Sequence, residues 1–509
     1  MTVETAYVVF CAAGLPFWVI QQPLGGRSIP FVLASCAYVI YLIFSGVNIP
    51  MDNITLITGC IAAWLTASLV WTDTKQSIFE LFNMLSYFLL FTAARKVPIG
   101  ITALTVFATG VAFASVQMYR TAKHNLPEDT FFCLGNGNHT AAFMLISLFA
   151  GAWLTINLSI WILPFVLLIA SALFLTRCKG AILGVIVGAI ITLCVAGMWQ
   201  AAALICLAVM AFGLRRYTSI PNLKRSTCGR IFLYLGAVEM IIKRPVTGWG
   251  LNMYRKELPD INAKIIRSPI YRKISEKANI DLPNRSHRVH NDHLELMAEL
   301  GIPGYVLFVY LFLHITYDPI ALGLLAAFAI CACFFFPLRE VHTAAPFWAV
   351  MGSVAGGTIS AVHLPWLVIV IIACIIFAVI IQTLRVFLGQ WYSEMARTKP
   401  NITEKEKLEF IDTALLHVPY NTGYLSDAAY YYSKVDPVKA FFYAARGLLH
   451  YDGGRVKQGI YDMFARTLIG ATESKVCHAV EDKALYLDPE FAPATVIKNY
   501  LFKKRRQND

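Results

Sequence analysis

Long apolar runs constrain the fold of this chain more than any other feature. A bilayer core about 30 Å thick needs roughly 20 apolar residues per helix, and about 17 are still enough. Candidate spans that meet or approach this length cover residues 5–20, 29–47, 54–71, 78–94, 99–118, 140–156, 160–176, 181–198, 201–214, 302–316, 320–336, 345–362 and 364–388. Three glycines at positions 352, 356 and 357 weaken the helical pattern of 345–362. The sequence predicts an all-α polytopic membrane protein with about 12–13 transmembrane helices.

Composition supports this class and excludes others. The 509 residues are 57% hydrophobic and only 15% charged, with a mean hydropathy of +0.59. These values exclude a secreted disulfide scaffold, a disordered chain and a soluble nucleic-acid binder. Most cysteines lie inside apolar runs and no CxxC pair occurs, so a cysteine-based metal framework is not expected. The first segment lacks a basic leader region and a cleavage site, which favours a retained first helix.

Charge divides the chain into parts. The net charge is +12, and residues 215–300 alone carry 16 basic and 8 acidic side chains. Residues 390–509 are also rich in charge but nearly balanced, with 17 basic and 15 acidic. We therefore predict transmembrane helices 1–9 in residues 1–214, a large loop in 215–300, the remaining transmembrane helices in 301–389 and a soluble helical domain in 390–509.

The predicted C-terminal domain has alanines and aromatic residues at helical spacing. Its run at 484–494 is similar to the end of a tetratricopeptide repeat, although no clean 34-residue period is present. Such TPR-like hairpins could bind a protein partner or simply cap the structure. The basic cluster at 503–506 suits solvent or lipid headgroups.

The orientation of the large loop is a point on which two arguments differ. Short-loop charges, such as Arg177 and Arg339 on the loop's side, place the loop in the cytoplasm by the positive-inside rule. That rule does not extend to a loop of about 85 residues, and basic residues that bind an anionic ligand would be present on either face.

The stretch from Arg288 to Gly304 closes the large loop and carries the clearest chemical pattern. Leu294, Met297 and Leu300 follow a helical repeat, so His290 and Asn291 should lie near a helix start at the membrane surface. A neutral imidazole with a pKa of about 6.5 can take a proton from a hydroxyl near neutral pH. The alternative is a polar cap at the interface.

Three histidines at positions 287, 290 and 293 invite a metal interpretation. On a helix, steps of three and six residues rotate the side chains by about 300° and 600°, so the three do not share one face. No other ligand cluster supports a zinc site here. The sequence predicts no metal site and no cofactor.

Two further basic motifs could bind phosphate. Arg177 and Lys179 lie in a short break between two spans, where they could contact lipid phosphates or grip a lipid-linked diphosphate. Arg230 precedes the run Lys243-Arg-Pro-Val-Thr-Gly-Trp-Gly250, whose glycines permit a tight turn or a close backbone approach. That run lacks the spacing of a nucleotide phosphate loop.

Together these motifs resemble a known superfamily. They are Gly135-Asn-Gly-Asn-His139, Thr176-Arg-Cys-Lys-Gly-Ala181, Arg230 ahead of Arg244-Pro-Val-Thr-Gly-Trp-Gly250, and His290-Asn-Asp-His-Leu-Glu-Leu-Met-Ala-Glu-Leu-Gly301. In this order they are similar to the O-antigen ligases, Wzy-type polymerases and PglL-type protein O-oligosaccharyltransferases. The resemblance covers about residues 70–390.

The resemblance implies a GT-C-like membrane glycosyltransferase of the bacterial inner membrane, with its long loop and active site on the periplasmic face. The implied donor is an undecaprenyl-diphosphate-linked glycan. His290 matches the essential histidine, Arg177 the arginine between two spans and Arg230 the arginine of the large loop. The family often has Ser-Arg-Gly-Ala where this chain has Arg-Cys-Lys-Gly-Ala, so Lys179 could replace Arg177 in that role.

The implied reaction suits these residue types. An acceptor hydroxyl attacks the anomeric carbon and undecaprenyl diphosphate leaves, so negative charge grows on the diphosphate. Arg177, Lys179, Arg230 and Arg288 would stabilise that charge. His290 would orient or deprotonate the acceptor. Direct displacement inverts the anomeric configuration, and no metal ion is required.

Asn291 and Glu295 are expected to support the catalytic histidine. The acceptor stays open: a glycan, a lipid or a protein hydroxyl would each fit the chemistry. We favour a ligase or a polymerase over a protein O-oligosaccharyltransferase, because no signature of a protein acceptor is present. From another class, a transporter or flippase of lipid-linked sugars would also be apolar and basic at one face, but it commonly has two similar halves.

Overall fold

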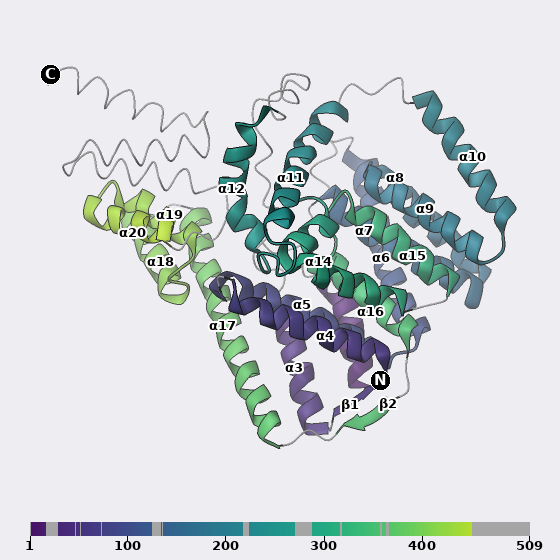
Figure 1. The fold of residues 1–509 in the computed structure, drawn as a ribbon, viewed down its shortest axis with the longest axis horizontal. Coiled ribbons are helices and arrows are strands. Elements are labelled where there is room, and N and C mark those ends of the chain that lie inside the picture. Colours follow the sequence, from purple (N-terminus) through teal and green to yellow (C-terminus); the bar gives the residue numbers. More distant parts are fainter. Residues whose placement is uncertain are drawn as a thin grey trace. The chain divides into compact units, whose positions relative to one another are not determined.

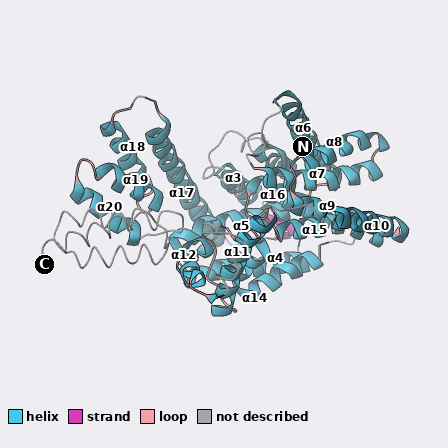
Figure 2. Ribbon diagram, turned by 90° about the horizontal axis from the view of Figure 1, so that it is seen from above, coloured by secondary structure: helices cyan, strands magenta, loops and turns pink. Residues whose placement is uncertain are grey.

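The computed structural model describes most of the chain as helices (Figures 1 and 2). The described residues are 2–16, 29–45, 47–50, 52–72, 74–124, 134, 136–216, 223–269, 288–315, 318–356, 359–362, 366–400 and 402–449. They form two compact units. Unit 1 is Met1–Leu223, Arg244–Leu251 and Val289–Phe377, and unit 2 is Lys224–Lys243, Asn252–Arg288 and Ala378–Asp509.

Unit 1 is a helical bundle. Its elements are α1 (Val3–Val9), a π-helical turn (Phe10–Gly14), α3 (Ile29–Ser45), β1 (Val47–Pro50), α4 (Asn53–Ala67), a 3-10 turn (Ser68–Val70), α5 (Thr74–Ala94), α6 (Ile99–His124), α7 (Gly137–Asn157), a 3-10 turn (Ile160–Ile162), α8 (Leu163–Leu175), α9 (Lys179–Val195), α10 (Trp199–Arg216), α14 (Asp292–Leu313), α15 (Pro319–Ala332), α16 (Val341–Ala355), β2 (Ile359–Val362) and the start of α17 (Trp366–Thr398).

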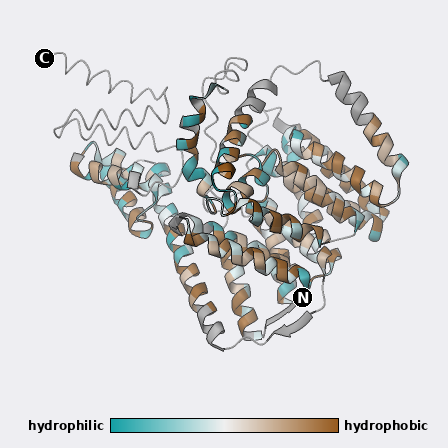
Figure 3. Cartoon of the chain, in the orientation of Figure 1, coloured by the Kyte–Doolittle hydropathy of each residue, from teal (hydrophilic) through white to brown (hydrophobic). Residues whose placement is uncertain are grey.

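The apolar character of these helices confirms a polytopic membrane protein. Among the described residues, the helical segments long and apolar enough to cross a membrane are Asn53–Val70, Ile99–Ala122, Gly137–Asn157, Asp292–Leu313 and Cys374–Thr398. Shorter apolar helical segments are Val3–Gly14, Ile29–Ile43, Glu80–Ala94, Ile160–Leu175, Lys179–Val195 and Pro319–Ala332. Figure 3 shows hydrophobic residues along most of α9 and α15.

One predicted span is wrong at its C-terminal end. The helix expected across residues 345–362 ends at Ala355, because Gly356 takes a φ of 54° that breaks the helical path. Ile359–Val362 then forms β2, which pairs antiparallel with β1 so that Val47 faces Val362. Another boundary also moves: α14 begins at Asp292, ten residues before the predicted span at 302–316.

Polar side chains set several helix starts in unit 1. Asp52 accepts a hydrogen bond from the backbone N–H of Thr55 at 3.0 Å, and Asp318 accepts one from Ala321 at 2.8 Å. These N-caps satisfy donors that the first turn of a helix leaves open. The sequence therefore marks where α4 and α15 begin, at the ends of apolar runs.

Small residues allow the helices to pack closely. A Cβ atom placed on Gly184 would lie 2.4 Å from the carbonyl oxygen of Ala327, and one on Gly188 would lie 2.4 Å from that of Gly323. Such contacts leave no space for a side chain, so α9 and α15 meet backbone to backbone. Close approach through small residues is the usual way to join helices in lipid.

Unit 2 contains α11 (Leu223–Lys243, of which the first residue belongs to unit 1), α12 (Met253–Ile266), the rest of α17, α18 (Glu404–His417), α19 (Thr422–Tyr432) and α20 (Pro437–Leu449). Buried Ile411, Leu425, Ala428 and Ala440 form part of a core between α18, α19 and α20. A capping box joins Thr403 and Glu406 at the start of α18. These consecutive helices agree with the predicted helical tail, whereas the repeat-like run at 484–494 and the basic cluster at 503–506 lie outside the described residues.

Candidate active site around His290

His290 lies at the entry to α14 in an unusual backbone conformation. Its φ is 58°, in the left-handed region that non-glycine residues adopt only rarely. Such outliers cluster at functional sites, where the surrounding structure holds them. The imidazole ring contacts Phe336 edge to face, with 5.1 Å between the ring centroids.

Two side chains predicted to support His290 hold the backbone on either side of it. The Val289 N–H donates to Oε2 of the buried Glu295 at 2.9 Å, and the Leu294 N–H donates to Oδ1 of Asn291 at 3.0 Å. Asn291 is thus the N-cap of α14. The two bonds fix the chain before and after His290, so its strained φ is maintained by local contacts.

A segment that the sequence did not single out connects several of the predicted motifs in unit 1. This is the α15–α16 connector, residues 333–340. A Cβ on Gly180 would lie 2.9 Å from Cβ of Phe334, so the connector touches the break that carries Arg177 and Lys179. Phe336 contacts His290 and also the ring of His139, at 5.8 Å. The connector therefore touches three predicted motifs that are far apart in the sequence.

Arg177 and Lys179 flank a sharp turn between α8 and α9. Arg177 has a φ of 52°, and its N–H donates to the carbonyl of Phe174 at 3.1 Å. Both basic side chains are exposed, whereas Cys178 between them is buried. The buried cysteine anchors the turn and leaves the two cations accessible.

A buried ion-pair network fixes the connector to α5 and α14. The Arg339 guanidinium donates to Glu80 at 2.9 Å and to Glu299 at 2.6 Å, and its Nε lies 4.0 Å from Glu295. Burial opposes the charge of Arg339, but attraction to Glu299, Glu295, Glu80 and Asp292 outweighs it and holds the pKa of Arg339 well above its ordinary value. Arg339 is therefore a permanent cation inside the bundle.

Two further contacts join α14 to its neighbours. The Leu338 N–H donates to Oδ2 of Asp292 at 2.8 Å. Nε2 of His293 lies 2.9 Å from the carbonyl oxygen of Ala329 and must donate to it, which leaves Nδ1 to accept from the Tyr305 hydroxyl at 3.0 Å. His293 thus has a structural role, and His287 lies outside the described residues.

The motif at 244–250 braces α14 rather than forming a loop of its own. Within Arg244–Leu251, the N–H groups of Trp249 and Gly250 donate to the carbonyls of Ala298 (3.0 Å) and Glu299 (2.7 Å), and the Ile302 N–H donates back to Pro245 at 2.7 Å. These bonds surround Gly301, whose φ of 72° kinks α14. The close backbone approach suggested by the glycines is therefore present, with α14 as the partner.

The structure groups the predicted site residues by unit. His290, Asn291, Glu295, Arg177 and Lys179 belong to unit 1. Arg230, half-buried on α11, and Arg288, half-buried before Val289, belong to unit 2. The participation of the last two in one site with His290 stays a prediction.

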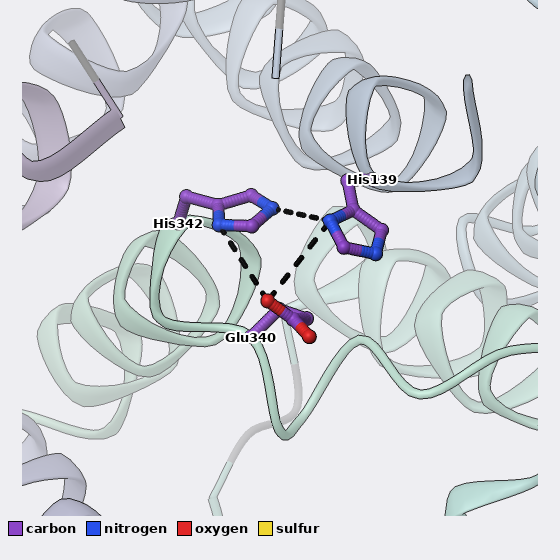
Figure 4. A group of neighbouring side chains, drawn as sticks. All are labelled: His139, Glu340 and His342. Atoms are coloured by element: carbon purple, nitrogen blue, oxygen red, sulfur yellow. Dashed lines mark hydrogen bonds and ion pairs between the residues drawn. The ribbon is translucent and has the colours of Figure 1, made fainter. Parts of the chain in front are cut away.

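A cluster of possible metal ligands was missed by the sequence analysis. Nδ1 of His139 and Nε2 of His342 are 2.9 Å apart, and Oε2 of Glu340 lies 4.0 Å from Nδ1 of each ring (Figure 4). His139 starts α7, whereas Glu340 and His342 start α16. Among the described residues, this trio could hold a metal ion. The sequence signals were His139, which ends the motif at 135–139, and the Arg-Glu-Val-His run at 339–342 after an apolar span.

Comparison with known proteins supports the family suggested by the motifs. The family model for O-antigen ligase matches residues 164–309. The match makes residues 164–309 similar to the O-antigen ligase family, and we call them the O-antigen ligase region. The O-antigen ligase region includes the Arg177 turn, Arg230, the 244–250 brace and His290, so the predicted resemblance is confirmed there. No curated protein matches the chain. At the level of the family, this match supports a membrane enzyme of the O-antigen ligase or polymerase type.

Proposed function

We propose that the protein is a glycosyltransferase that moves glycan from an undecaprenyl-diphosphate donor to a hydroxyl acceptor, as an O-antigen ligase or polymerase. The observation that carries this proposal is the geometry of His290. Its left-handed backbone is held by Glu295 and Asn291 at the start of α14, inside the O-antigen ligase region. This arrangement presents one imidazole at a fixed place.

In the proposed reaction, the acceptor oxygen forms a bond to the anomeric carbon while the bond from that carbon to the diphosphate oxygen breaks. The acceptor proton passes to the His290 imidazole, and the bonding electrons leave with undecaprenyl diphosphate. General base assistance of this kind is typically worth about 10²–10⁴-fold. The single displacement inverts the anomeric carbon and needs no metal ion.

The leaving diphosphate requires cations. Arg177 and Lys179 are exposed on the turn between α8 and α9, where a charged ligand can reach them. Arginine stays charged and meets phosphate oxygens with two parallel N–H donors. We assign donor binding to these two residues together with Arg230 and Arg288.

We place the enzyme in the bacterial inner membrane with its large loop in the periplasm. Nine predicted spans precede the loop, so it lies opposite a cytoplasmic amino terminus. Thirteen spans would put residues 390–509 on the loop's side. In this proposal the helices α18–α20 bind a protein partner, and the apolar bundle accommodates the polyprenyl chain among the membrane lipids.

Reconstitution tests the proposal directly. Purified full-length protein in lipid nanodiscs receives a fluorescent lipid-linked glycan and, in separate reactions, lipid A core, a second lipid-linked glycan or a Ser/Thr-containing protein. A new glycosidic product identifies an enzyme, and the productive acceptor separates ligase, polymerase and O-oligosaccharyltransferase. Movement of the donor across liposomes without any product with the three acceptors would instead identify a flippase and refute the proposal.

A further inference from the structure

The cluster of His139, Glu340 and His342 combines the ligand types of a transition-metal site. Two imidazoles and one carboxylate with a free coordination position suit Zn²⁺ or a similar divalent ion. The hard ions Mg²⁺ and Ca²⁺ prefer oxygen ligands instead. His139 is 3% exposed and His342 is fully buried, so both rings are fixed by packing.

The distances agree with one shared ion. With Zn–N bonds of about 2.0–2.1 Å, two nitrogens that share an ion at about 90–109° lie roughly 2.9–3.4 Å apart. Nδ1 of His139 and Nε2 of His342 are 2.9 Å apart. Oε2 of Glu340 is 4.0 Å from Nδ1 of His139, and the ligand atoms of the three residues all lie within 4.8 Å of one another, so the Glu340 side chain must rotate to bring its oxygen to the ion. Glu340 is the N-cap of α16 and its side chain is 19% exposed, which leaves it room to rotate.

Charge around the cluster favours a cation over an anion. Arg339, the residue before Glu340, lies among four carboxylates, those of Glu80, Glu295, Glu299 and Asp292. These carboxylates lie on α5 and α14, and Arg339 and Leu338 of the connector that supplies Glu340 bind to them. Together with the Glu340 carboxylate, this negative charge opposes the partial positive charge of the starts of α7 and α16.

We propose that His139, Glu340 and His342 bind one divalent transition-metal ion of the Zn²⁺ type. The ion joins the start of α7 to the start of α16, at the place where the rings of His139 and His342 already meet. Its role is structural: it fixes the α15–α16 connector, whose Phe336 contacts both His139 and His290. The ion takes no part in glycan transfer, so the proposal stands apart from the proposed function.

Metal analysis of the full-length protein tests this site. The protein is purified without a histidine tag, in nanodiscs, and its metal content is measured by mass spectrometry before and after titration with Zn²⁺ or Co²⁺. Wild type is expected to hold about one equivalent. His139→Gln and His342→Gln should bind at least about 100-fold more weakly, since even the loss of an outer hydrogen-bond partner costs 10–100-fold. His314→Gln, on a partly exposed histidine at the end of α14, should bind as wild type does.

A second readout keeps the test independent of folding defects. A chelator should lower the melting temperature of wild type and of His290→Ala, but leave that of His342→Gln unchanged. Bound Co²⁺ should show an absorption spectrum without thiolate charge-transfer bands, which separates this site from the cysteines. Less than a tenth of an equivalent in wild type after titration, or equal binding by the monodisperse His342→Gln protein, would show that the two rings form only a hydrogen-bonded pair.

Discussion

Arg339 offers the sharpest test of how the bundle is stabilised, because its charge is buried and shared by several carboxylates. Its side chain and that of Glu299 are fully buried, and that of Glu80 is only 11% exposed. Replacing Arg339 with methionine keeps much of the volume but leaves these carboxylates without their cation. Removing one partner of a buried ion pair typically costs about 3–5 kcal/mol.

A count of the contacts gives a similar magnitude. Arg339 makes two charge-assisted hydrogen bonds, to Glu80 and Glu299. At about 1.5–3 kcal/mol each, their loss amounts to roughly 3–6 kcal/mol. A loss of about 3–5 kcal/mol reduces the ratio of folded to unfolded protein roughly 10²- to 10⁴-fold.

Equilibrium unfolding by SDS in mixed micelles measures this change. Arg397→Met is the matched control, because Arg397 pairs with Asp427 at 2.5 Å while its own side chain is 51% exposed. Exposed pairs contribute only about 0–1 kcal/mol. The Arg339→Met deficit should also shrink in the double variant Arg339→Met/Glu299→Gln, which removes one uncompensated charge. Equal losses in the two single variants would refute the assignment of Arg339 as the central cation of the bundle.

Four further outcomes are expected. His290→Ala should lower the transfer rate by about 10²–10⁴-fold, with a melting temperature and membrane insertion like those of His314→Ala; wild-type turnover would end the catalytic assignment. Arg177→Ala and Arg230→Ala should each reduce transfer far more than Arg397→Ala, and lysine at either site should restore only part of the activity, because a point charge cannot reproduce the bidentate fork. Full rescue by lysine at both sites would refute the diphosphate clamp. A loss confined to Lys179→Ala would assign diphosphate binding at this turn to Lys179 instead of Arg177. Gly301→Ala should destabilise the protein more than Gly197→Ala. Both glycines have a positive φ (72° and 78°), so backbone strain of about 1–2 kcal/mol is common to both, but only Gly301 would place its new Cβ 2.1 Å from a carbonyl oxygen, that of Val246. Equal losses of stability would show that the 244–250 brace yields easily. Impermeant thiol reagent should label Lys264→Cys and Lys434→Cys in a cysteine-free protein in outer-membrane-permeabilised cells, and protection of Lys264→Cys until lysis would place the large loop in the cytoplasm.

Much of the proposed chemistry could be predicted because its signals are local. The conformation at residues 288–295 depends on neighbours in the sequence: Asn291 caps the next turn, and Glu295 reaches back to Val289. The turn that carries Arg177 and Lys179 is likewise set by the residues between two apolar runs. These motifs were sufficient to suggest the family that residues 164–309 match.

Other features depend on contacts between residues far apart in the chain. Arg339 counted in the sequence only as a short-loop charge, yet it lies 259 positions from its partner Glu80. His139 and His342 are separated by 203 positions, so no spacing rule could pair them. The glycines of 244–250 did indicate a close backbone approach, but not that α14 would be the partner.

The sequence by itself therefore determined that the chain is an apolar helical bundle and where most helices begin, because hydropathy, helical period and N-caps act within one or two turns. It also predicted that His290 and Asn291 lie near a helix start, but not the left-handed φ of His290. Only the tertiary structure decided that the α15–α16 connector joins the Arg177 turn, His139 and His290, and that residues 359–362 pair with β1 instead of continuing a helix. The physical reason is that packing and buried charge compensation depend on which surfaces meet, and that becomes defined only when distant segments come together.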